Sequence, residues 1–340
     1  MTVFAIGWIA GAVALGASSL LPFVVRPLLV RLGIMDVPNE RSSHARPVLR
    51  GLGLAVLVAM GAGGGFAVGA EYAAAGEWRI LLTVVAGSLA AGLLGFAEDL
   101  RGLSVGVRSV LLLAIALGAA VAILLLAGSG IPLWGAAALT VYAVLFISSY
   151  INVANFMDGL NGISGFHGVI AGLAFAAAGG LLDLPWLFAA GLVLAAGFGG
   201  FLPWNLTKPG AFLGDVGSYL LGGAVAVTSF AALIAGVPLL ATIGPMVIYF
   251  GDVAVTLVKR VRSGHRWDEP HKEHTYQRVQ QLGYSHVQAS GMTAAATLTT
   301  SLLGLLSLFT GTAGSIALFA AGLAVLVLYL LLPRLLPNRH

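Results

Sequence analysis

Eleven runs of about 20 apolar residues alternate with short polar connections along this 340-residue chain, and this alternation limits the possible folds most. A helix of about 20 residues crosses the roughly 30 Å apolar core of a bilayer. Charged residues make up only 9% of the chain, against about a quarter in soluble domains. We expect an all-α polytopic membrane protein with a single transmembrane domain, residues 1–340. Its spans are predicted near 3–25, 52–70, 80–97, 109–128, 131–150, 165–182, 186–203, 218–235, 237–257, 289–310 and 314–332.

The Lys and Arg residues indicate how these helices are oriented. With the N-terminus outside, the cytoplasmic connections and the C-terminal tail hold 16 of the 17 Lys and Arg residues, which fits the positive-inside rule. We therefore expect the C-terminus in the cytoplasm. The first apolar run lacks a basic leader and a convincing cleavage site, so it is expected to remain as a helix. The expected cytoplasmic connections are 26–51, 98–108, 151–164, 204–217 and 258–288.

Composition also excludes several kinds of site. The chain has no cysteine, which excludes disulfides, thiolate nucleophiles and iron–sulfur clusters. Its cations lie beside the predicted membrane, so no nucleic-acid partner is expected. Ten of the 13 Asp and Glu residues also fall on the predicted cytoplasmic side, although acidic residues contribute little to orientation. Their concentration near His and Asn predicts a catalytic or binding face.

Two of the polar connections carry closely spaced acids and amides. Glu98 and Asp99 end one span, and adjacent carboxylates repel each other unless a cation such as Mg²⁺ lies between them. The alternative for this pair is an ordinary solvated helix end. The segment INVANFMDGLNG, residues 151–162, places four polar residues at three-residue intervals on a predicted helix end. A continuous helix cannot direct all four side chains to one centre, because three-residue steps fall short of a full turn. A break in the helix at Gly159 or Gly162 could bring them together. A self-capped Asn-rich turn is the alternative.

Two further connections have features typical of phosphate binding. In FLGDVGSYLLG, Asp215 stands at a predicted helix start, where free amide groups and a carboxylate suit a phosphate or a metal as well as a simple cap. In PHKEHTYQR, His271 and His274 are three residues apart beside several cations. Without cysteine this spacing favours a diphosphate over zinc, because Arg and Lys bind phosphate oxygens. Anionic lipid headgroups are the alternative partner of that loop.

Taken in order, five segments resemble the motifs of the polyprenyl-phosphate N-acetylhexosamine-1-phosphate transferase superfamily, glycosyltransferase family 4. They are DVPNERSSHARPVLRGLG, GFAEDL, NVANFMDGLNG, FLGDVGSYLLG and PHKEHTYQR. The resemblance implies transfer of a sugar 1-phosphate from a UDP-sugar to undecaprenyl phosphate, with release of UMP. It also implies Mg²⁺ as cofactor, which Mn²⁺ could replace. The last segment is most similar to enzymes that initiate O-antigen synthesis, including those that use 6-deoxy N-acetylhexosamines, and UDP-GlcNAc remains open.

The resemblance also implies roles for residues at matching positions. The expected catalytic acids are Glu98, Asp99 and Asp158. Asp215 and Asn155 are the expected metal ligands, and Phe212, Asn161 and Asn152 the expected nucleotide contacts. His271, His274 and Arg278 are expected at the donor's phosphates and sugar, and Arg108 and Arg101 at the lipid phosphate. The chain departs from the family at Glu98, where Asp is usual, at Asn161, where an acid is common, and at Leu49 and Leu52 in a Gly-rich loop.

Two reaction routes and two other functions are open at this point. We favour direct attack of the lipid phosphate on the donor's β-phosphorus, and a covalent route through Asp158 is the alternative. A transporter would explain many spans, but the predicted span centres are almost free of charge. A polyprenyl-phosphate-binding protein without transferase activity is the other alternative. The expected location is the bacterial inner membrane, with membrane lipid as partner, a cytoplasmic active site and a possible homodimer.

Overall fold

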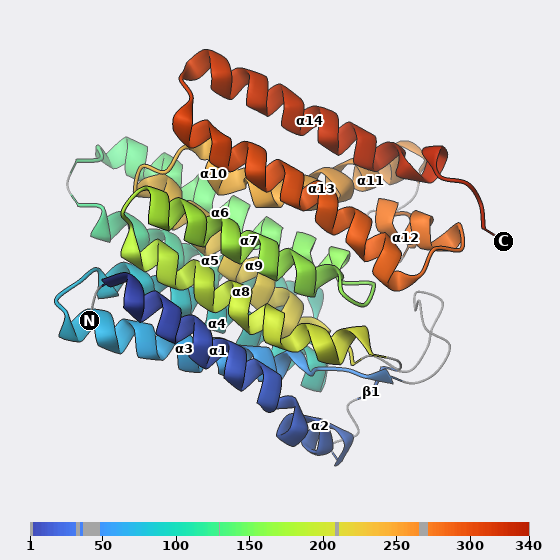
Figure 1. Cartoon of the computed structure of the whole chain (residues 1–340), viewed down its shortest axis with the longest axis horizontal. Helices are drawn as coiled ribbons and strands as arrows, with labels where there is room; N and C mark the ends of the chain where they lie inside the picture. The colour runs from blue at the N-terminus through green and yellow to red at the C-terminus, as the bar shows by residue number, and fades with distance from the viewer. Residues whose placement is uncertain are drawn as a thin grey trace.

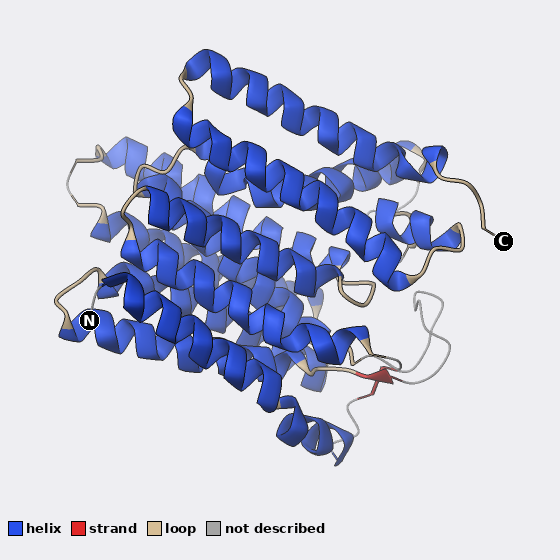
Figure 2. Cartoon of the chain, in the orientation of Figure 1, coloured by secondary structure: helices blue, strands red, loops and turns tan. Residues whose placement is uncertain are grey.

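Helices account for nearly all of the structure, a computed structural model that describes residues 3–31, 35–36, 48–128, 130–207, 211–264 and 271–339. In these residues the strands are one two-residue antiparallel pair, β1 (Met35–Asp36) and β2 (Val48–Leu49), shown red in Figure 2. The α-helices are α1 (Val3–Leu20), α2 (Pro22–Arg31), α3 (Gly53–Ala73), α4 (Trp78–Arg101), α5 (Val105–Leu126), α6 (Leu133–Met157), α7 (Ile163–Leu181), α8 (Pro185–Leu206), α9 (Gly214–Ile234), α10 (Leu239–Ile243), α11 (Val247–Arg262), α12 (Thr275–Gln281), α13 (His286–Leu306) and α14 (Thr312–Leu335). The all-α prediction is confirmed.

Ten helical segments in the described residues are long and apolar enough to cross a membrane, or eleven if one bent pair counts as a span. Each predicted span overlaps one of these segments, counting the bent pair as one. The first predicted span is the bent pair, because the chain turns by 42° between α1 and α2. Pro22 begins α2, and proline lacks the amide hydrogen that would continue the ladder from α1. The ninth span is likewise interrupted by a 3₁₀ turn, Gly244–Met246, that contains Pro245.

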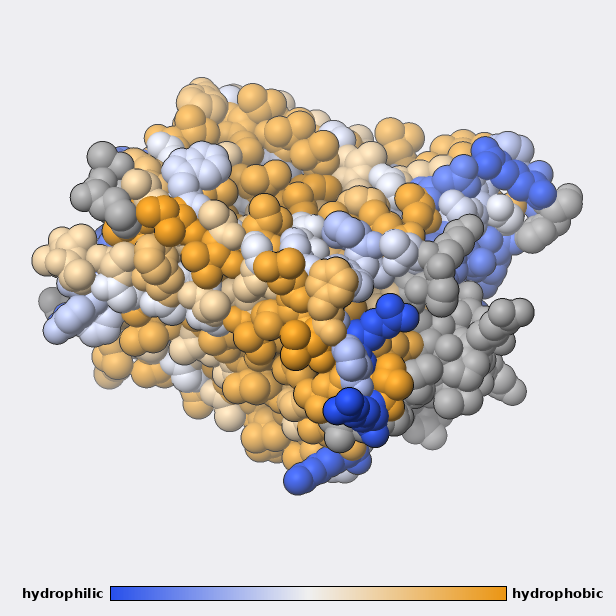
Figure 3. Space-filling model, turned by 60° about the horizontal axis from the view of Figure 1, so that its bottom comes forward, coloured by the Kyte–Doolittle hydropathy of each residue, from blue (hydrophilic) through white to orange (hydrophobic). Residues whose placement is uncertain are grey.

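The helices run alongside one another in a bundle with distinct ends (Figure 1). The N-terminus lies at one end and the C-terminus at the other. The C-terminal ends of α4, α6, α8 and α11 lie at the end of the bundle that holds the C-terminus, which we call the polar end. Figure 3 shows apolar residues over most of the visible face, with hydrophilic residues toward one end. This separation of apolar flank and polar end is the arrangement that a bilayer requires.

Burial differs sharply from helix to helix. In α9, 89% of the apolar window is buried inside the protein, and α3, α4, α5, α6 and α7 all pack on it. In α14 the same fraction is 6%. A helix that is apolar on all sides must be enclosed by protein or by lipid. The structure therefore has a central helix, α9, and a peripheral one, α14, whose surface suits lipid contact.

Candidate functional site

Three helix ends meet at the polar end of the bundle and carry most of the predicted site. They are the C-terminal ends of α4 and α6 and the N-terminal end of α9. Gly95 allows the closest approach, because a Cβ atom there would overlap the backbone carbonyl oxygen of Asp215. The glycine in GFAEDL thus brings α4 against the first turn of α9. Asp99, one turn further along α4, reaches that turn as a result.

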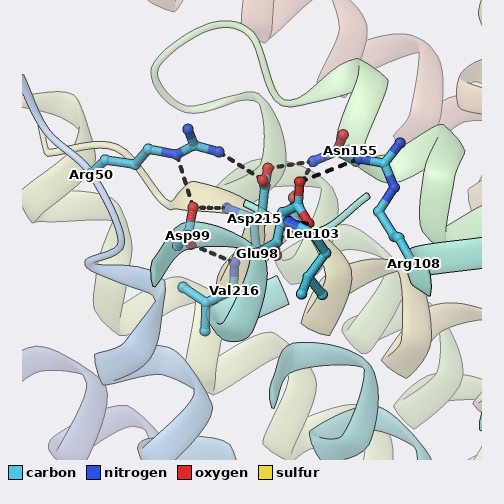
Figure 4. A network of polar contacts seen from close by, with 9 residues as sticks. Arg50, Glu98, Asp99, Leu103, Arg108, Asn155, Asp215 and Val216 are labelled. Carbon is cyan, nitrogen blue, oxygen red and sulfur yellow. Dashed lines mark hydrogen bonds and ion pairs between the residues drawn. The ribbon is translucent and has the colours of Figure 1, made fainter. Parts of the chain in front are cut away.

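The Asp99 carboxylate binds the start of α9 and a neighbouring guanidinium (Figure 4). Its two oxygens accept hydrogen bonds from the backbone amides of Asp215, at 3.1 Å, and Val216, at 2.9 Å. These amides have no partner inside the helix, and a carboxylate is favourable at the positive end of its dipole. Gly214 permits the arrangement, since it adopts φ +76° and a Cβ atom there would lie 2.7 Å from Asp99 Oδ2.

Arg50 joins Asp99 to Asp215. Its Nε lies 2.8 Å from Asp99 Oδ1, and its Nη2 lies 2.7 Å from Asp215 Oδ2. The Asp99 side chain is 1% exposed, whereas that of Asp215 is 18% exposed. The two carboxylates therefore share one cation on a single face, and only Asp215 keeps substantial access to solvent. Arg50 was not among the predicted site residues.

The end of α6 contributes the amide of Asn155 and the carboxylate of Asp158. Asn155 Nδ2 donates to Asp215 Oδ1 at 2.8 Å and to Ser218 Oγ at 3.0 Å. The helix ends after Met157, so Asp158 points elsewhere and accepts a hydrogen bond of 2.6 Å from Ser164 Oγ. Burial raises the pKa of Asp158 to about 7, with further increases from the charges of Asp215 and Asp99. The predicted break at the Gly159–Gly162 turn is therefore present.

We expect Ser164→Ala to move the acid limb of the pH–rate profile to higher pH, by about one unit. The Ser164 hydroxyl lowers the pKa of Asp158, so its removal raises that pKa further, and a charge-assisted hydrogen bond is worth about 1.5–3 kcal/mol. Turnover that needs the Asp158 carboxylate falls as pH drops below this pKa. The lipid phosphate also titrates near pH 6, but equally in both proteins. An unchanged limb would remove Asp158 from the rate-controlling ionisation.

Glu98 lies on a neighbouring face of the α4 terminus and holds the following turn. Its Oε2 accepts a hydrogen bond of 2.9 Å from the Leu103 amide, and its Oε1 lies 3.5 Å from Arg108 Nη1. Arg108 is in the first turn of α5 and its side chain is 29% exposed. Glu98 therefore keeps Arg108 beside the carboxylates while leaving part of the guanidinium accessible.

Asn205, near the end of α8, connects two loops of the site. Its side chain accepts a hydrogen bond from the Gly162 amide and donates one of 2.9 Å to the Ala211 carbonyl. Its backbone carbonyl accepts from Asn161 Nδ2 at 2.8 Å. Asn161 thus contacts protein through its amide nitrogen, while its Oδ1 is buried without a partner in the described residues. Phe212, the residue after Ala211, is half-buried, and its backbone amide donates a hydrogen bond to the Leu49 carbonyl.

Asn205→Ala should lower both stability and turnover. The change leaves the buried Gly162 amide and the Ala211 carbonyl unpaired, at about 1–3 kcal/mol for each group. We expect a lower midpoint in a detergent thermal melt and a turnover reduced by about tenfold. Arg334→Ala, a truncation to the same residue at an exposed position near the end of α14, should alter neither measurement. Equal behaviour of the two variants would refute a connecting role for Asn205.

The segment around α12 lies against the end of α6. Tyr276 is 1% exposed and donates a hydrogen bond of 3.0 Å to the Phe156 carbonyl. His274 is buried, whereas His271 and Arg278 are half-buried. Burial lowers the pKa of His271 to about 4, with further decreases from the charges of His274 and Arg260. At neutral pH His271 can therefore bind an anion through a hydrogen bond but not through a positive charge.

The remaining predicted residues lie apart from this centre or outside the described residues. Asn152 donates its amide to the Ser148 carbonyl of its own helix at 2.9 Å. Arg101 is exposed at the end of α4. The first motif, DVPNERSSHARPVLRGLG, is described only at residue 36 and from Val48 onward, and the 258–288 connection lacks 265–270. Arg50 was overlooked because one arginine among many cytoplasmic cations has no distinguishing pattern, although its Gly-rich surroundings were a signal.

Comparisons with known proteins bear on this arrangement. The model of glycosyl transferase family 4 matches residues 81–233, which contain the three helix ends described above. A decaprenyl-phosphate N-acetylglucosaminephosphotransferase of Mycolicibacterium smegmatis is 28% identical over 327 residues, covering 85% of this chain and 75% of the relative. Residues 81–233 of this chain are thus similar to glycosyl transferase family 4. Within it, the resemblance to the polyprenyl-phosphate hexosamine-1-phosphate transferases is confirmed.

Other members of the family show the same relationship. A probable undecaprenyl-phosphate N-acetylglucosaminyl 1-phosphate transferase of Bacillus subtilis is 27% identical, covering 77% of this chain and 74% of the relative. A phospho-N-acetylmuramoyl-pentapeptide-transferase of Desulforudis audaxviator is 34% identical over 176 residues, covering 43% of this chain and 51% of the relative. The chain is a multi-pass membrane protein that is similar to sugar-phosphate transferases acting on polyprenyl phosphates.

Proposed function

We propose that this protein transfers an N-acetylhexosamine 1-phosphate from a UDP-sugar to undecaprenyl phosphate, producing a lipid-linked diphosphate sugar and UMP. The observation that carries the proposal is the shared position of Asp99, Arg50 and Asp215 where three helix ends meet. Carboxylates and a guanidinium on one partly exposed face suit a reaction between two anionic phosphates. UDP-GlcNAc is the first donor to test, because the relatives' names specify N-acetylglucosamine.

The residues fit Mg²⁺ in the way that ion is usually held. In the described part of the chain no three His, Asp or Glu side chains form a ready metal cluster. Mg²⁺ is commonly bound by one or two carboxylates, with the substrate's phosphates and water completing the octahedron. Asp215, with 18% of its side chain exposed, and its neighbour Asn155 would supply protein oxygens. When bound, the ion would screen the negative charge that accumulates as the two phosphates approach.

The chain's own residues then have distinct tasks. Asp99 fixes the first turn of α9 and so fixes Asp215. Arg50 and Arg108 flank the carboxylates, and both can bind phosphate oxygens. We assign Phe212 and Asn161 to the base, and His271 and Arg278 to the donor's phosphates and sugar, because they stand at the matching positions of the family's motifs. In the direct route, a lipid-phosphate oxygen bonds to the β-phosphorus as the bond to the UMP oxygen breaks.

The cell context follows from the same assignment. A water-soluble UDP-sugar and an acceptor phosphate at the headgroup level can meet only where the bundle's polar end leaves the membrane. We place that end at the cytoplasmic face of a bacterial inner membrane, in accord with the Lys and Arg distribution. The product would start a cell-envelope glycan, for which O-antigen is one candidate.

Purified protein in detergent, supplied with undecaprenyl phosphate, Mg²⁺ and a panel of radiolabelled UDP-sugars, tests the function. We expect a labelled lipid diphosphate and UMP from at least one N-acetylhexosamine donor. If no donor gives a product, the proposed function is wrong, and a binding protein or a transporter remains as the alternative. A single-turnover reaction without acceptor separates the two routes, because a labelled phospho-sugar retained on the protein would establish the covalent path through Asp158.

A further inference from the structure

Asp252 is a fully buried carboxylate inside a membrane-spanning helix, and the reaction outlined above gives it no task. It lies in α11. An ionisable residue in such a position is costly unless it has partners, and it usually has a function. Its partners come from three parts of the chain. Thr256 Oγ1, in α11 itself, lies at 3.1 Å, and Tyr329 OH of α14 lies at 2.9 Å. At the start of α12, His274 Nδ1 lies at 3.2 Å and the Thr275 amide at 3.0 Å.

Two of these contacts fix the beginning of α12. Thr275 is the first residue of that helix, so its amide hydrogen has no partner within the helix. Asp252 accepts this hydrogen with both oxygens, at 3.2 and 3.0 Å. His274 is the residue before the helix, and its Nδ1 faces the same carboxylate. A carboxylate at Nδ1 selects the tautomer with hydrogen on that nitrogen and holds the ring's orientation.

The start of α12 in turn determines how this segment meets the catalytic loop. Tyr276 follows Thr275 directly, and its hydroxyl donates to the Phe156 carbonyl, two residues before Asp158. Gly159 lies so close that a Cβ atom there would overlap the Tyr276 hydroxyl. His271 lies on the other side of His274, and the centroids of the two imidazole rings are 4.9 Å apart. A shift at Asp252 would therefore be passed both to the Asp158 loop and to His271.

The peripheral helix α14 reaches this network through a single residue. Tyr329 is the one buried residue among those described in α14, and it is 3% exposed. Its hydroxyl donates to Asp252 Oδ2, the oxygen that also accepts from Thr275. Tyr329, on an otherwise lipid-facing helix, thus binds the carboxylate that fixes the start of α12.

We propose that Asp252, supported by Tyr329, is a positioning residue that sets the α12 segment against the Asp158 loop and so shapes the UDP-sugar side of the site. The proposal rests on the proposed function for its kinetic consequence, but not for its structural one. Asp252→Asn keeps the size of the side chain while replacing one acceptor oxygen with a donor group. We expect the KM for the UDP-sugar to rise about tenfold or more, as for loss of a charge-assisted hydrogen bond, with the KM for the lipid unchanged.

The matched control is Asp183→Asn, the same chemical change at an exposed residue between α7 and α8. Asp183 has φ 55°, a conformation that asparagine also accepts. Tyr329→Phe removes only one donor and should raise the KM for the UDP-sugar less than Asp252→Asn does. Its own control is Tyr72→Phe, at a tyrosine 66% exposed. Lower kcat with both KM values unchanged would mean loss of folded enzyme and would overturn the proposal.

Hydrogen exchange of backbone amides tests the same idea without activity. We expect faster exchange across residues 271–281 in Asp252→Asn and in Tyr329→Phe than in wild type or either control. Unchanged exchange in both variants would overturn the positioning role, whatever the kinetics. If wild-type protein gives no turnover with any donor, the proposed function fails, and exchange alone decides the role of Asp252. If Asp252→Asn does not fold, Tyr329→Phe supplies both measurements.

Discussion

Asp215→Asn should reduce turnover by about 1000-fold or more while the bundle remains folded. The substitution preserves the shape of the side chain and removes the charge that Arg50 and Asn155 address at 2.7 and 2.8 Å. Loss of one preorganised electrostatic group costs about 10²–10³ in rate, and loss of a metal-binding carboxylate should cost at least as much. The measurement is the rate of UMP release at saturating substrates, together with a thermal melt.

Asp183→Asn provides the control for this result, because that exposed acid lies between α7 and α8, at the end of the bundle opposite the site. It should retain full turnover. The melting midpoint of Asp215→Asn should lie within a few degrees of wild type, since the side chain is partly exposed and its neighbours keep hydrogen-bond partners. Turnover near the wild-type rate would exclude Asp215 as a metal ligand.

Arg50→Ala should lower kcat by about 100-fold and at the same time reduce the Mg²⁺ concentration needed for half-maximal rate. Arg50 contacts both Asp99 and Asp215, so its guanidinium and a divalent ion compete for the same carboxylate oxygens. Without it, the carboxylates bind the ion more readily, but the phosphates lose a bidentate cation. Turnover measured against free Mg²⁺ concentration separates the two effects.

Arg50→Lys makes this prediction sharper. Lysine keeps the charge but cannot bridge two carboxylates with a planar fork, so its kcat should lie between those of wild type and Arg50→Ala. A higher Mg²⁺ requirement in Arg50→Ala would contradict competition and would indicate that Arg50 helps to hold the ion. Arg334→Ala, at an exposed arginine near the end of α14, is the control and should change neither quantity.

The spans could be predicted from the sequence because the physics is simple. A bilayer core of fixed thickness requires about 20 apolar residues, and each predicted run overlaps a helix of that kind or, at the N-terminus, a bent pair of helices. What hydropathy could not reveal was the bend before Pro22 and the 3₁₀ turn at Pro245. A single proline hardly changes the average hydropathy of a long window, although it removes a hydrogen-bond donor from the helix.

The polar residues were predictable in part. Asp99, Asn155 and Asp215 stand in recognisable motifs, and the structure brings them to one place. Asn205 could not be selected, because an isolated asparagine near a helix end is ordinary until its partners are known, and Arg50 stood in a Gly-rich motif that gave no sign of its partners. Their partners are Gly162 and Ala211 for the former, and two carboxylates of separate helices for the latter. Such contacts depend on tertiary packing, which local spacing does not encode.

The enclosure of α9 has consequences for the heat inactivation of such an enzyme and for its adaptation to other substrates. Asp215 stands at the tip of a helix that other helices surround, so it cannot be displaced while those neighbours stay assembled. Heat inactivation and the cooperative unfolding of the bundle should therefore occur over one temperature interval. Adaptation to a different sugar would act on the surrounding segments, such as α12, and leave the central helix unaltered.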